Sequence, residues 1–316
     1  MPLTLAEIRQ AVDVLRRYLS PSRLVPADSL TAKAGRPVYL KMESDLPTAS
    51  FKSRGAIVAL SDRLSRSEIT EVVCASTGNH GAAVAYAARL FGLRATIFLP
   101  QNPNPIKRAR IQALGASIRE HGHDLADANQ AGADYAGEKN AYFLSDAADQ
   151  ALPAGPATIG IEILEQQPKT EIIYVPVGDT ALIRGIASAI KLLRPSIKII
   201  GVQAEAAPSY YLSWKQRQAV ETPDCQTIAD GLATRTPDSS NVEAIVNLVD
   251  DFRLVSEKSL LEAIKHLLLQ EHVAAEPAGA ATTAALLNDG NAQGTTVLIL
   301  SGANISEDVL RMSLCP

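Results

Sequence analysis

The sequence has few aromatic residues and no long apolar run. Aromatic residues make up 4% of the 316 residues, and there is a single tryptophan. No apolar stretch approaches the roughly 20 residues that a membrane-spanning helix needs, so we expect no membrane partner. Residues 1–20 are amphipathic and contain several arginines, without a continuous apolar segment before a cleavage site. They therefore do not predict a secretory signal.

The sequence also lacks an excess of positive charge. Its 30 basic and 34 acidic residues give a net charge of −4. Because nucleic-acid binding depends on clustered positive charge, we expect no nucleic-acid partner. The three cysteines, Cys74, Cys225 and Cys315, lie far apart, which excludes a disulfide framework and favours a cytoplasmic location. Cys74 lies in an apolar run and is expected to be a small core residue.

Several familiar catalytic and metal-binding patterns are missing. The chain contains no GxSxG, GxGxxG or Walker A motif. His121 and His123 are close in sequence, but no third ligand accompanies them at a clear spacing. Because a zinc site needs three or four convergent ligands, this pair is interpreted as part of a polar loop. No metal site is expected.

Strand-like and helix-like segments alternate along the chain. Strands are expected at 38–41, 71–75, 95–99, 116–119, 171–177, 197–202 and 295–300. Helices are expected at 53–64, 82–91, 105–114, 158–166, 182–193 and 259–270. Repeated βαβ units with Val/Ile-rich strands predict an α/β fold of two open, mostly parallel twisted sheets flanked by helices.

No low-complexity linker separates the two series of elements, so the domain boundaries are expected where the chain crosses between sheets. The irregular stretches 44–50 and 146–157 are the candidate crossings. They predict a large domain from residues 1–44 and 150–316, and a small domain from residues 45–149.

Ligands of open α/β sheets bind beyond the carboxyl ends of the strands, so polar residues there are site candidates. Lys52 follows the first strand at the start of a predicted helix. The helix dipole there disfavours a cation, which suits an amine nucleophile. An ordinary solvated lysine is the alternative interpretation. Ser301 follows the last strand, where its hydroxyl can bond a buried heterocycle or simply belong to a turn.

Two other strand ends lead into helices with free N–H groups, which is typical of anion sites. They are the segments 76–81 (Ser-Thr-Gly-Asn-His-Gly) and 178–182 (Gly-Asp-Thr-Ala-Leu). Each can instead be a plain capping turn, with Ser76 or Thr77 as the cap of the first helix and Asp179 as the cap of the second. A carboxylate at Asp179 repels a phosphate unless it points away or caps the helix.

In this order and at these spacings, the motifs resemble fold-type II pyridoxal-phosphate enzymes, the tryptophan synthase β superfamily. The branch they resemble is that of threonine/serine dehydratases and serine racemases. The resemblance extends from about Ser22 to the end of the chain. It rests on segments 50–56, 76–81, 112–116, 227–231, 275–280 and 301–304.

The resemblance implies that pyridoxal 5′-phosphate binds in the cleft between the domains. It implies that Lys52 forms a Schiff base with the cofactor and moves the α-proton, and that Phe51 lies behind the ring. Asn79 bonds the 3′-oxygen, and Ser301 faces the pyridine nitrogen. The implied phosphate loop comprises Gly178, Asp179, Thr180, Ala181 and Leu182. The implied loop for the substrate carboxylate comprises Ser76, Thr77, Gly78, Asn79 and His80, with Thr77 also catalytic.

A neutral hydroxyl at Ser301 leaves the pyridine ring unprotonated, which favours rapid loss of a β-substituent. The implied activity is therefore an ammonia-lyase (dehydratase) reaction. A β-hydroxy-α-amino acid such as L-threonine or L-serine gives a 2-oxo acid and ammonia. The resemblance further implies a homodimer. Since the chain ends soon after Ser301, we expect no C-terminal regulatory domain.

Three departures from the family pattern bear on these expectations. The usual run of four glycines is replaced by Gly-Asp-Thr-Ala, so Ala181 must keep a negative φ. Racemases have serine at the position of Thr77. Related enzymes hold a divalent cation through acidic residues near Gln203 and Ser209, which are neutral here.

Alternative functions stay open. One is an amino-acid racemase. Another is a lyase for a specialised hydroxy amino acid, such as hydroxyaspartate, phenylserine or an ectoine breakdown product. The third is a non-catalytic binding protein, for which loss of Lys52 would have been the sign.

Overall fold

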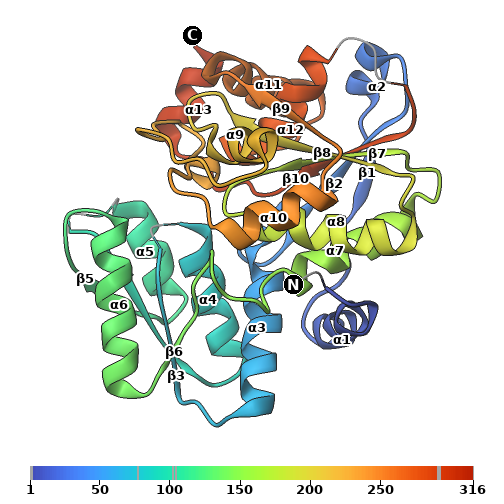
Figure 1. The fold of residues 1–316 in the computed structure, drawn as a ribbon. Helices are drawn as coiled ribbons and strands as arrows, with labels where there is room; N and C mark the ends of the chain where they lie inside the picture. Colours follow the sequence, from blue (N-terminus) through green and yellow to red (C-terminus); the bar gives the residue numbers. More distant parts are fainter. Residues whose placement is uncertain (1–2, 77, 102, 104, 290–292, 316) are drawn as a thin grey trace.

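The strands of the protein form two separate sheets (Figure 1). The computed structural model describes residues 3–315 except 77, 102, 104 and 290–292. The larger sheet has the order β1-β2-β10-β7-β8-β9, in which only the β1–β2 pair is antiparallel. Its strands are β1 (Leu24–Pro26), β2 (Val38–Met42), β7 (Ile172–Pro176), β8 (Lys198–Ala204), β9 (Asp251–Val255) and β10 (Thr296–Leu300).

The smaller sheet is entirely parallel, with the order β5-β4-β3-β6. Its strands are β3 (Glu71–Ala75), β4 (Arg94–Leu99), β5 (Ser117–Glu120) and β6 (Tyr142–Phe143). The helices around it are α3 (Lys52–Arg66), α4 (Asn79–Leu90), α5 (Pro105–Ala113) and α6 (Leu125–Lys139).

The remaining helices lie with the larger sheet or beside it (Figure 1). They are α1 (Leu5–Leu15), α2 (Asp28–Ala34), α7 (Ala154–Gln166), α8 (Ala181–Leu193), α9 (Ser209–Gln216), α10 (Ser239–Leu248), α11 (Glu257–Gln270), α12 (Pro277–Asn288) and α13 (Glu307–Leu314). Two short 3₁₀ turns, η1 (Glu43–Asp45) and η2 (Asp230–Leu232), complete the described elements.

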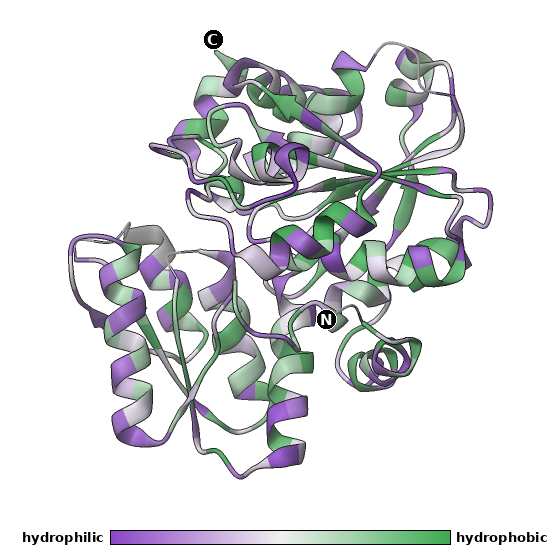
Figure 2. Cartoon of the chain, viewed as in Figure 1, coloured by the Kyte–Doolittle hydropathy of each residue, from purple (hydrophilic) through white to green (hydrophobic). Residues whose placement is uncertain are grey.

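The predicted fold class, two mostly parallel sheets flanked by helices, is confirmed. Each predicted strand and helix is present, with ends that differ by a few residues. Strands β7 and β10 are buried along their whole length, which explains their continuous apolar sequence. Figure 2 shows the same pattern, with hydrophobic strands inside and mixed helices outside. The domain limits at residues 45 and 149 stay a prediction.

The apolar core has a part on each sheet. One buried cluster packs around β3 and β4 and contains Cys74, whose exposed fraction is 0%. This confirms the expected core role of Cys74. Two further clusters cover the two faces of the larger sheet. Among the described residues, no helix has the length and apolarity needed to cross a membrane.

The two sheets meet where their carboxyl ends approach each other. The segment after β2 forms an antiparallel bridge with the segment after β10, between Ser50 and Gly302. In addition, the N–H of Phe51 donates to the carbonyl of Ser301 at 3.0 Å. These contacts fix the start of α3 against the end of β10.

Candidate active site

A cavity of about 380 Å³ lies between the two sheets, in the size range of small-molecule and cofactor sites. Its walls come from the carboxyl ends of strands in both sheets. The structure places almost every residue that the sequence singled out on this cavity. They are Phe51, Lys52, Ser76, Gly78, Asn79, His80, Gly178, Asp179, Thr180, Ala181, Leu182 and Ser301. Thr77 lies outside the described residues.

Lys52 is the first residue of α3, and its side chain is 19% exposed. The ammonium nitrogen lies 5.3 Å from the centre of the Phe51 ring. It also forms an ion pair with Asp146, whose other oxygen lies 3.5 Å from Nδ1 of His80. Sequence reasoning missed Asp146. The only available signal was its position at the start of the expected domain crossing.

The two carboxylates near Lys52 have opposite pKa shifts. Burial raises the pKa of Asp146, but the cationic Lys52 and the nearby His80 outweigh this effect and hold it below its usual value. Burial also raises the pKa of Asp179, and the charge of Asp146 raises it further. Asp179 accepts a hydrogen bond of 3.2 Å from the hydroxyl of Thr234. The site therefore shifts the pKa values of two neighbouring carboxyl groups in opposite directions.

Asn79 is held in place from both ends of its amide. Its Nδ2 donates to Glu276 at 2.7 Å, and its Oδ1 accepts from Nδ2 of Asn304. Glu276, 5% exposed, also accepts the backbone N–H of Asn304 at 3.1 Å. This network fixes which way the amide points, so that its second N–H can serve a ligand. The sequence had placed Glu276 and Asn304 in matching segments without assigning them this role.

The start of α4 is not capped by a side chain. Its N-cap residue is Gly78, and the hydroxyl of Ser76 accepts the N–H of Gly78 at 3.2 Å. The alternative in which Ser76 caps this helix is therefore wrong, because the hydroxyl bonds inside the turn. An N-terminus without a side-chain cap, facing a cavity, can hold an anion.

The turn from β7 into α8 has an unusual backbone at Thr180, whose φ is +67°. Ala181, by contrast, is not among the residues with positive φ, as the sequence required. Asp179 does not cap α8; the N-cap is Thr180, and no side chain makes a capping bond. The capping alternative for Asp179 is thus wrong. A Cβ on Gly178 would lie 2.2 Å from the carbonyl oxygen of Gly231, so only glycine fits there.

This turn also holds an unsatisfied donor. The hydroxyl of Thr180 is buried and has no hydrogen-bond partner. A buried polar group without a partner is costly, which points to a ligand as its partner. The hydroxyl and the uncapped N-terminus of α8 together suit a phosphate group.

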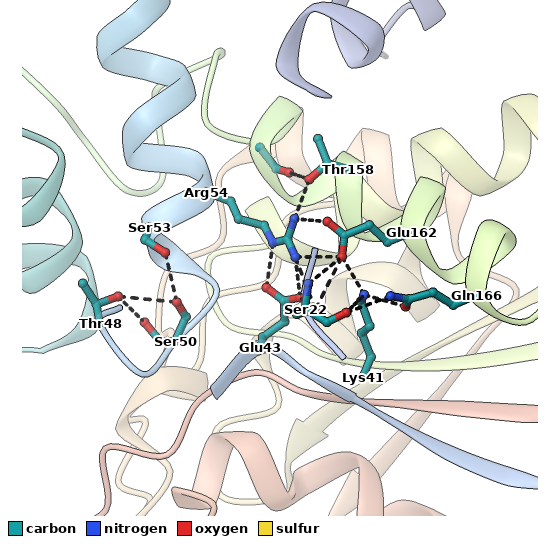
Figure 3. A network of polar contacts seen from close by, with 11 residues as sticks. Ser22, Lys41, Glu43, Thr48, Ser50, Ser53, Arg54, Thr158, Glu162 and Gln166 are labelled. Atoms are coloured by element: carbon teal, nitrogen blue, oxygen red, sulfur yellow. Dashed lines mark hydrogen bonds and ion pairs between the residues drawn. The ribbon is translucent and has the colours of Figure 1, made fainter. Parts of the chain in front are cut away.

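A polar network behind the cavity anchors the start of α3 (Figure 3). Arg54 donates to Glu43 from Nε at 2.8 Å and to Glu162 from Nη1 at 2.5 Å. Lys41 donates to the same Glu162 at 2.5 Å. The side chains of Arg54 and Lys41 are almost fully buried. This network therefore fixes α3 against β2 and α7, two residues from Lys52.

Gln203 and Ser209, at the positions where related enzymes hold a divalent cation, form hydrogen bonds within the protein. Oε1 of Gln203 accepts the N–H of Tyr211 at 2.9 Å, and the hydroxyl of Ser209 donates to the carbonyl of Thr234. Within the part of the chain that the structure describes, no group of three or more His, Cys, Asp or Glu side chains is arranged to hold a metal.

Comparison with known proteins gives consistent matches over nearly the whole chain. The family model described as "Pyridoxal-phosphate dependent enzyme" matches residues 15–302. The L-threonine ammonia-lyase of Thermotoga maritima is 36% identical over 309 residues, 98% of this chain and 77% of the relative. The L-threonine ammonia-lyase of Geobacter sulfurreducens is 36% identical over 307 residues, 96% of this chain and 76% of the relative.

Solved structures of similar proteins also match the fold of this chain over nearly its whole length. Maize serine racemase superposes with a TM-score of 0.93 at 28% identity, covering 99% of this chain and 97% of that one. The processed form of threonine deaminase isoform 2 from Solanum lycopersicum gives a TM-score of 0.91 at 29% identity, covering 99% of this chain and 89% of that one.

Proposed function

This chain belongs to the pyridoxal-phosphate dependent enzyme family, and we propose that it is an ammonia-lyase acting on a β-hydroxy-α-amino acid. It eliminates the β-hydroxyl of L-threonine or L-serine and releases a 2-oxo acid and ammonia. Relatives with the name L-threonine ammonia-lyase match almost the whole chain. The observation that carries the proposal is that Lys52 and the neutral hydroxyl of Ser301 line the same cavity.

The residues present fit pyridoxal 5′-phosphate. The unpartnered hydroxyl of Thr180 and the N-terminus of α8 suit the phosphate. Lys52 supplies an amine for the aldehyde, and Asn79 offers an N–H for the ring oxygen. Ser301 is 4% exposed and stands at the end of β10, where its hydroxyl serves the ring nitrogen.

When bound, the cofactor supplies the electron sink for breaking the bond to the α-proton. Lys52 is the attachment residue, and its amine takes the α-proton of the substrate. The N-terminus of α4, with Ser76, Gly78 and His80, holds the α-carboxylate. Asn79, which is held by Glu276, orients the cofactor ring relative to the amine of Lys52. Thr77 is the proposed acid/base residue on the opposite side.

Two further properties belong to the proposal. Cys74, Cys225 and Cys315 are free thiols, which supports a reducing, cytoplasmic location. Leu192 and Leu193 expose apolar side chains at the end of α8, which supports an apolar contact between two copies in a homodimer. Light scattering on the purified protein tests the dimer, and a monomeric mass at micromolar concentration contradicts it.

Racemisation is the second candidate, because the similarity to maize serine racemase covers the whole fold. It needs an acid on the opposite side of the substrate from Lys52. Its rate therefore depends on Thr77, whereas elimination depends on Lys52 alone for removal of the proton.

Proton NMR in D₂O distinguishes these activities. The purified, cofactor-loaded protein is incubated with L-threonine and L-serine in separate tubes. Appearance of 2-oxobutyrate or pyruvate is the expected result. Loss of the α-proton signal without product supports racemisation instead. No change in either tube contradicts both substrates and points to a more specialised β-substituted amino acid.

A further inference from the structure

We propose that Asp146 is a further catalytic residue, which carries the proton from Lys52 to the leaving hydroxyl. His80 shares this proton with it. The inference rests on the proposed elimination reaction and adds a residue to it. No motif of the sequence had singled out Asp146.

The first observation is direct contact with the reacting nitrogen. Oδ2 of Asp146 pairs with Nζ of Lys52, and both side chains line the cavity. Their exposed fractions are 22% and 19%, so the pair is shielded from bulk water but faces the substrate space. Since proton transfer needs hydrogen-bond distance, Asp146 is placed to take a proton from Lys52.

The second observation is the orientation of His80. Its Nε2 lies 3.0 Å from the carbonyl oxygen of Leu144. A carbonyl only accepts, so we assign the ring proton to Nε2. In the neutral ring Nδ1 is then an acceptor, and it faces Oδ1 of Asp146 at 3.5 Å. Neither of these two atoms has another hydrogen-bond partner.

Two facing acceptors provide a place for one proton. While Lys52 is a cation, it balances the partly buried charge of Asp146. When the Lys52 nitrogen becomes neutral, this balance is lost, and an unpaired buried carboxylate is costly. A proton held between Asp146 and His80 restores it. Loss of the charge on Lys52 is thus coupled to protonation of the pair.

With Asp146 as the proton carrier, the proton removed from the α-carbon becomes the proton that the leaving hydroxyl needs. The bond between the α-carbon and hydrogen breaks, its electrons stay on carbon, and Nζ of Lys52 takes the proton. Lys52 passes the proton to the carboxylate of Asp146, which shares it with Nδ1 of His80. The electron pair on the α-carbon then forms a double bond to the β-carbon, while the bond between the β-carbon and oxygen breaks with both of its electrons on oxygen. Asp146 protonates that oxygen. The group leaves as water, and no external acid or oxidant is required.

Other titratable groups lie around this pair. Asp179, from the turn before α8, interacts with Asp146 and has a raised pKa. Cys74, on β3, is fully buried; burial and the charge of Asp146 both raise the pKa of its thiol. Both groups are thus held toward their neutral forms. Lys52 and His80 are the facing groups that can exchange a proton with Asp146.

The test compares Asp146→Asn with a matched control, Asp149→Asn. Asp149 lies in the same segment and bonds the hydroxyl of Tyr142 and the N–H of Ala151, away from Lys52. An asparagine keeps the size of Asp146 and one acceptor oxygen for Lys52, but it cannot carry the proton. In D₂O, we expect elimination by the Asp146→Asn variant to fall about 100-fold. The control should keep the wild-type rate.

The decisive quantity is the ratio of deuterium exchange at the α-carbon to elimination. If Lys52 still removes the α-proton but cannot pass it on, the proton returns or exchanges. The ratio should then rise at least about tenfold in Asp146→Asn, because only the later transfer is blocked. An equal fall of exchange and elimination would mean that Asp146 merely positions Lys52, and it would overturn the proposal.

A second readout needs no substrate. The absorbance of the bound cofactor is titrated with pH in the wild type and both variants. Removing a carboxylate beside the Lys52 nitrogen should move the midpoint to lower pH by about 1–2 units, the size typical of a close charge pair. An unchanged midpoint contradicts the contact. A shifted midpoint in a protein that acts on neither threonine nor serine would support the contact between Asp146 and Lys52. It would contradict the two proposed substrates.

The variant Asp146→Glu keeps the proposal testable if Asp146→Asn does not fold. It keeps a carboxylate and should recover part of the elimination rate with a near wild-type exchange ratio. A ratio as high as that of Asp146→Asn would also overturn the proposal.

Discussion

Arg54 binds both carboxylate oxygens of Glu162, at 2.5 Å from Nη1 and 2.9 Å from Nη2 (Figure 3). The two residues lie on α3 and α7. This bidentate pair therefore connects the helix that begins with Lys52 to a helix of the larger sheet. Paired geometry of this kind gives orientation as well as energy.

Replacing Glu162 with glutamine should lower the free energy of unfolding by about 3–5 kcal/mol, because it leaves the buried charge of Arg54 under-compensated. Urea denaturation followed by circular dichroism measures this change. Glu165→Gln is the control, since Glu165 is exposed on the same helix. A loss under about 1 kcal/mol, the range of an exposed pair, would show that Glu162 is not a structural anchor.

Stability should fall in acid. Burial raises the pKa of Glu162, but Arg54 and Lys41 outweigh it and hold the pKa below the ordinary value of 4.5. Because the folded pKa is the lower one, the stabilisation is complete above the unfolded pKa. It is lost as the pH falls through the folded pKa. Unfolding titrations between pH 3 and 6 should give a flatter profile for Glu162→Gln than for the wild type.

Replacing Lys52 with alanine should abolish elimination, with a rate loss of at least about 1,000-fold, because no other amine is assigned to remove the α-proton. Borohydride treatment followed by mass spectrometry should attach the cofactor to the wild type and not to Lys52→Ala. Attachment at another lysine would contradict the assignment of Lys52.

Replacing Thr180 with alanine should weaken cofactor binding by about 10- to 150-fold, since a hydrogen bond to a charged group contributes about 1.5–3 kcal/mol. Equilibrium titration of the cofactor-free protein measures the dissociation constant. Thr180→Ser keeps the hydroxyl and should bind nearly as well as the wild type. Equal affinity of the wild type and both variants would contradict the assignment of Thr180 to the phosphate site.

Replacing Ser301 with aspartate should slow elimination at least about tenfold, because a carboxylate at this position favours a protonated ring and a longer-lived carbanion. Exchange of the α-proton in D₂O should persist. Ser301→Ala separates loss of the hydroxyl from gain of charge. An unchanged elimination rate in Ser301→Asp would contradict the assigned contact with the ring nitrogen.

The fold was largely predictable because its signals are local. The buried strands β7 and β10 are apolar runs of about the expected length. Gly92 and Gly115, each with a positive φ, follow the ends of α4 and α5. The sequence did not predict helices α1, α2, α6, α9, α10, α12 and α13, nor strands β1, β6 and β9. Helix α6 is rich in alanine with only a weak apolar face, and β6 has two residues. β9 carries charged residues at Asp251 and Arg253, which conceal its strand character.

The site was predictable only where its residues lie in motifs. Lys52, Asn79 and Ser301 follow strand ends, and the topology brings strand ends together. The supporting contacts depend on partners distant in the chain. Asp146 reaches Lys52 from a segment that belongs to no motif, and Glu276, although it lies in a motif, reaches Asn79 from a distant part of the chain. Pairings of this kind become visible only when the chain is folded.

The strand order also constrains the sequence of events during synthesis. The smaller sheet, β3 to β6, uses one continuous stretch of chain and can form while the ribosome is still translating the rest. The larger sheet cannot, because β10 lies between β2 and β7. Strand β2 is made long before β10 and waits without this parallel neighbour until β10 has been synthesised. Since Ser301 directly follows β10, the cavity becomes complete only after β10 has been made and has inserted between β2 and β7.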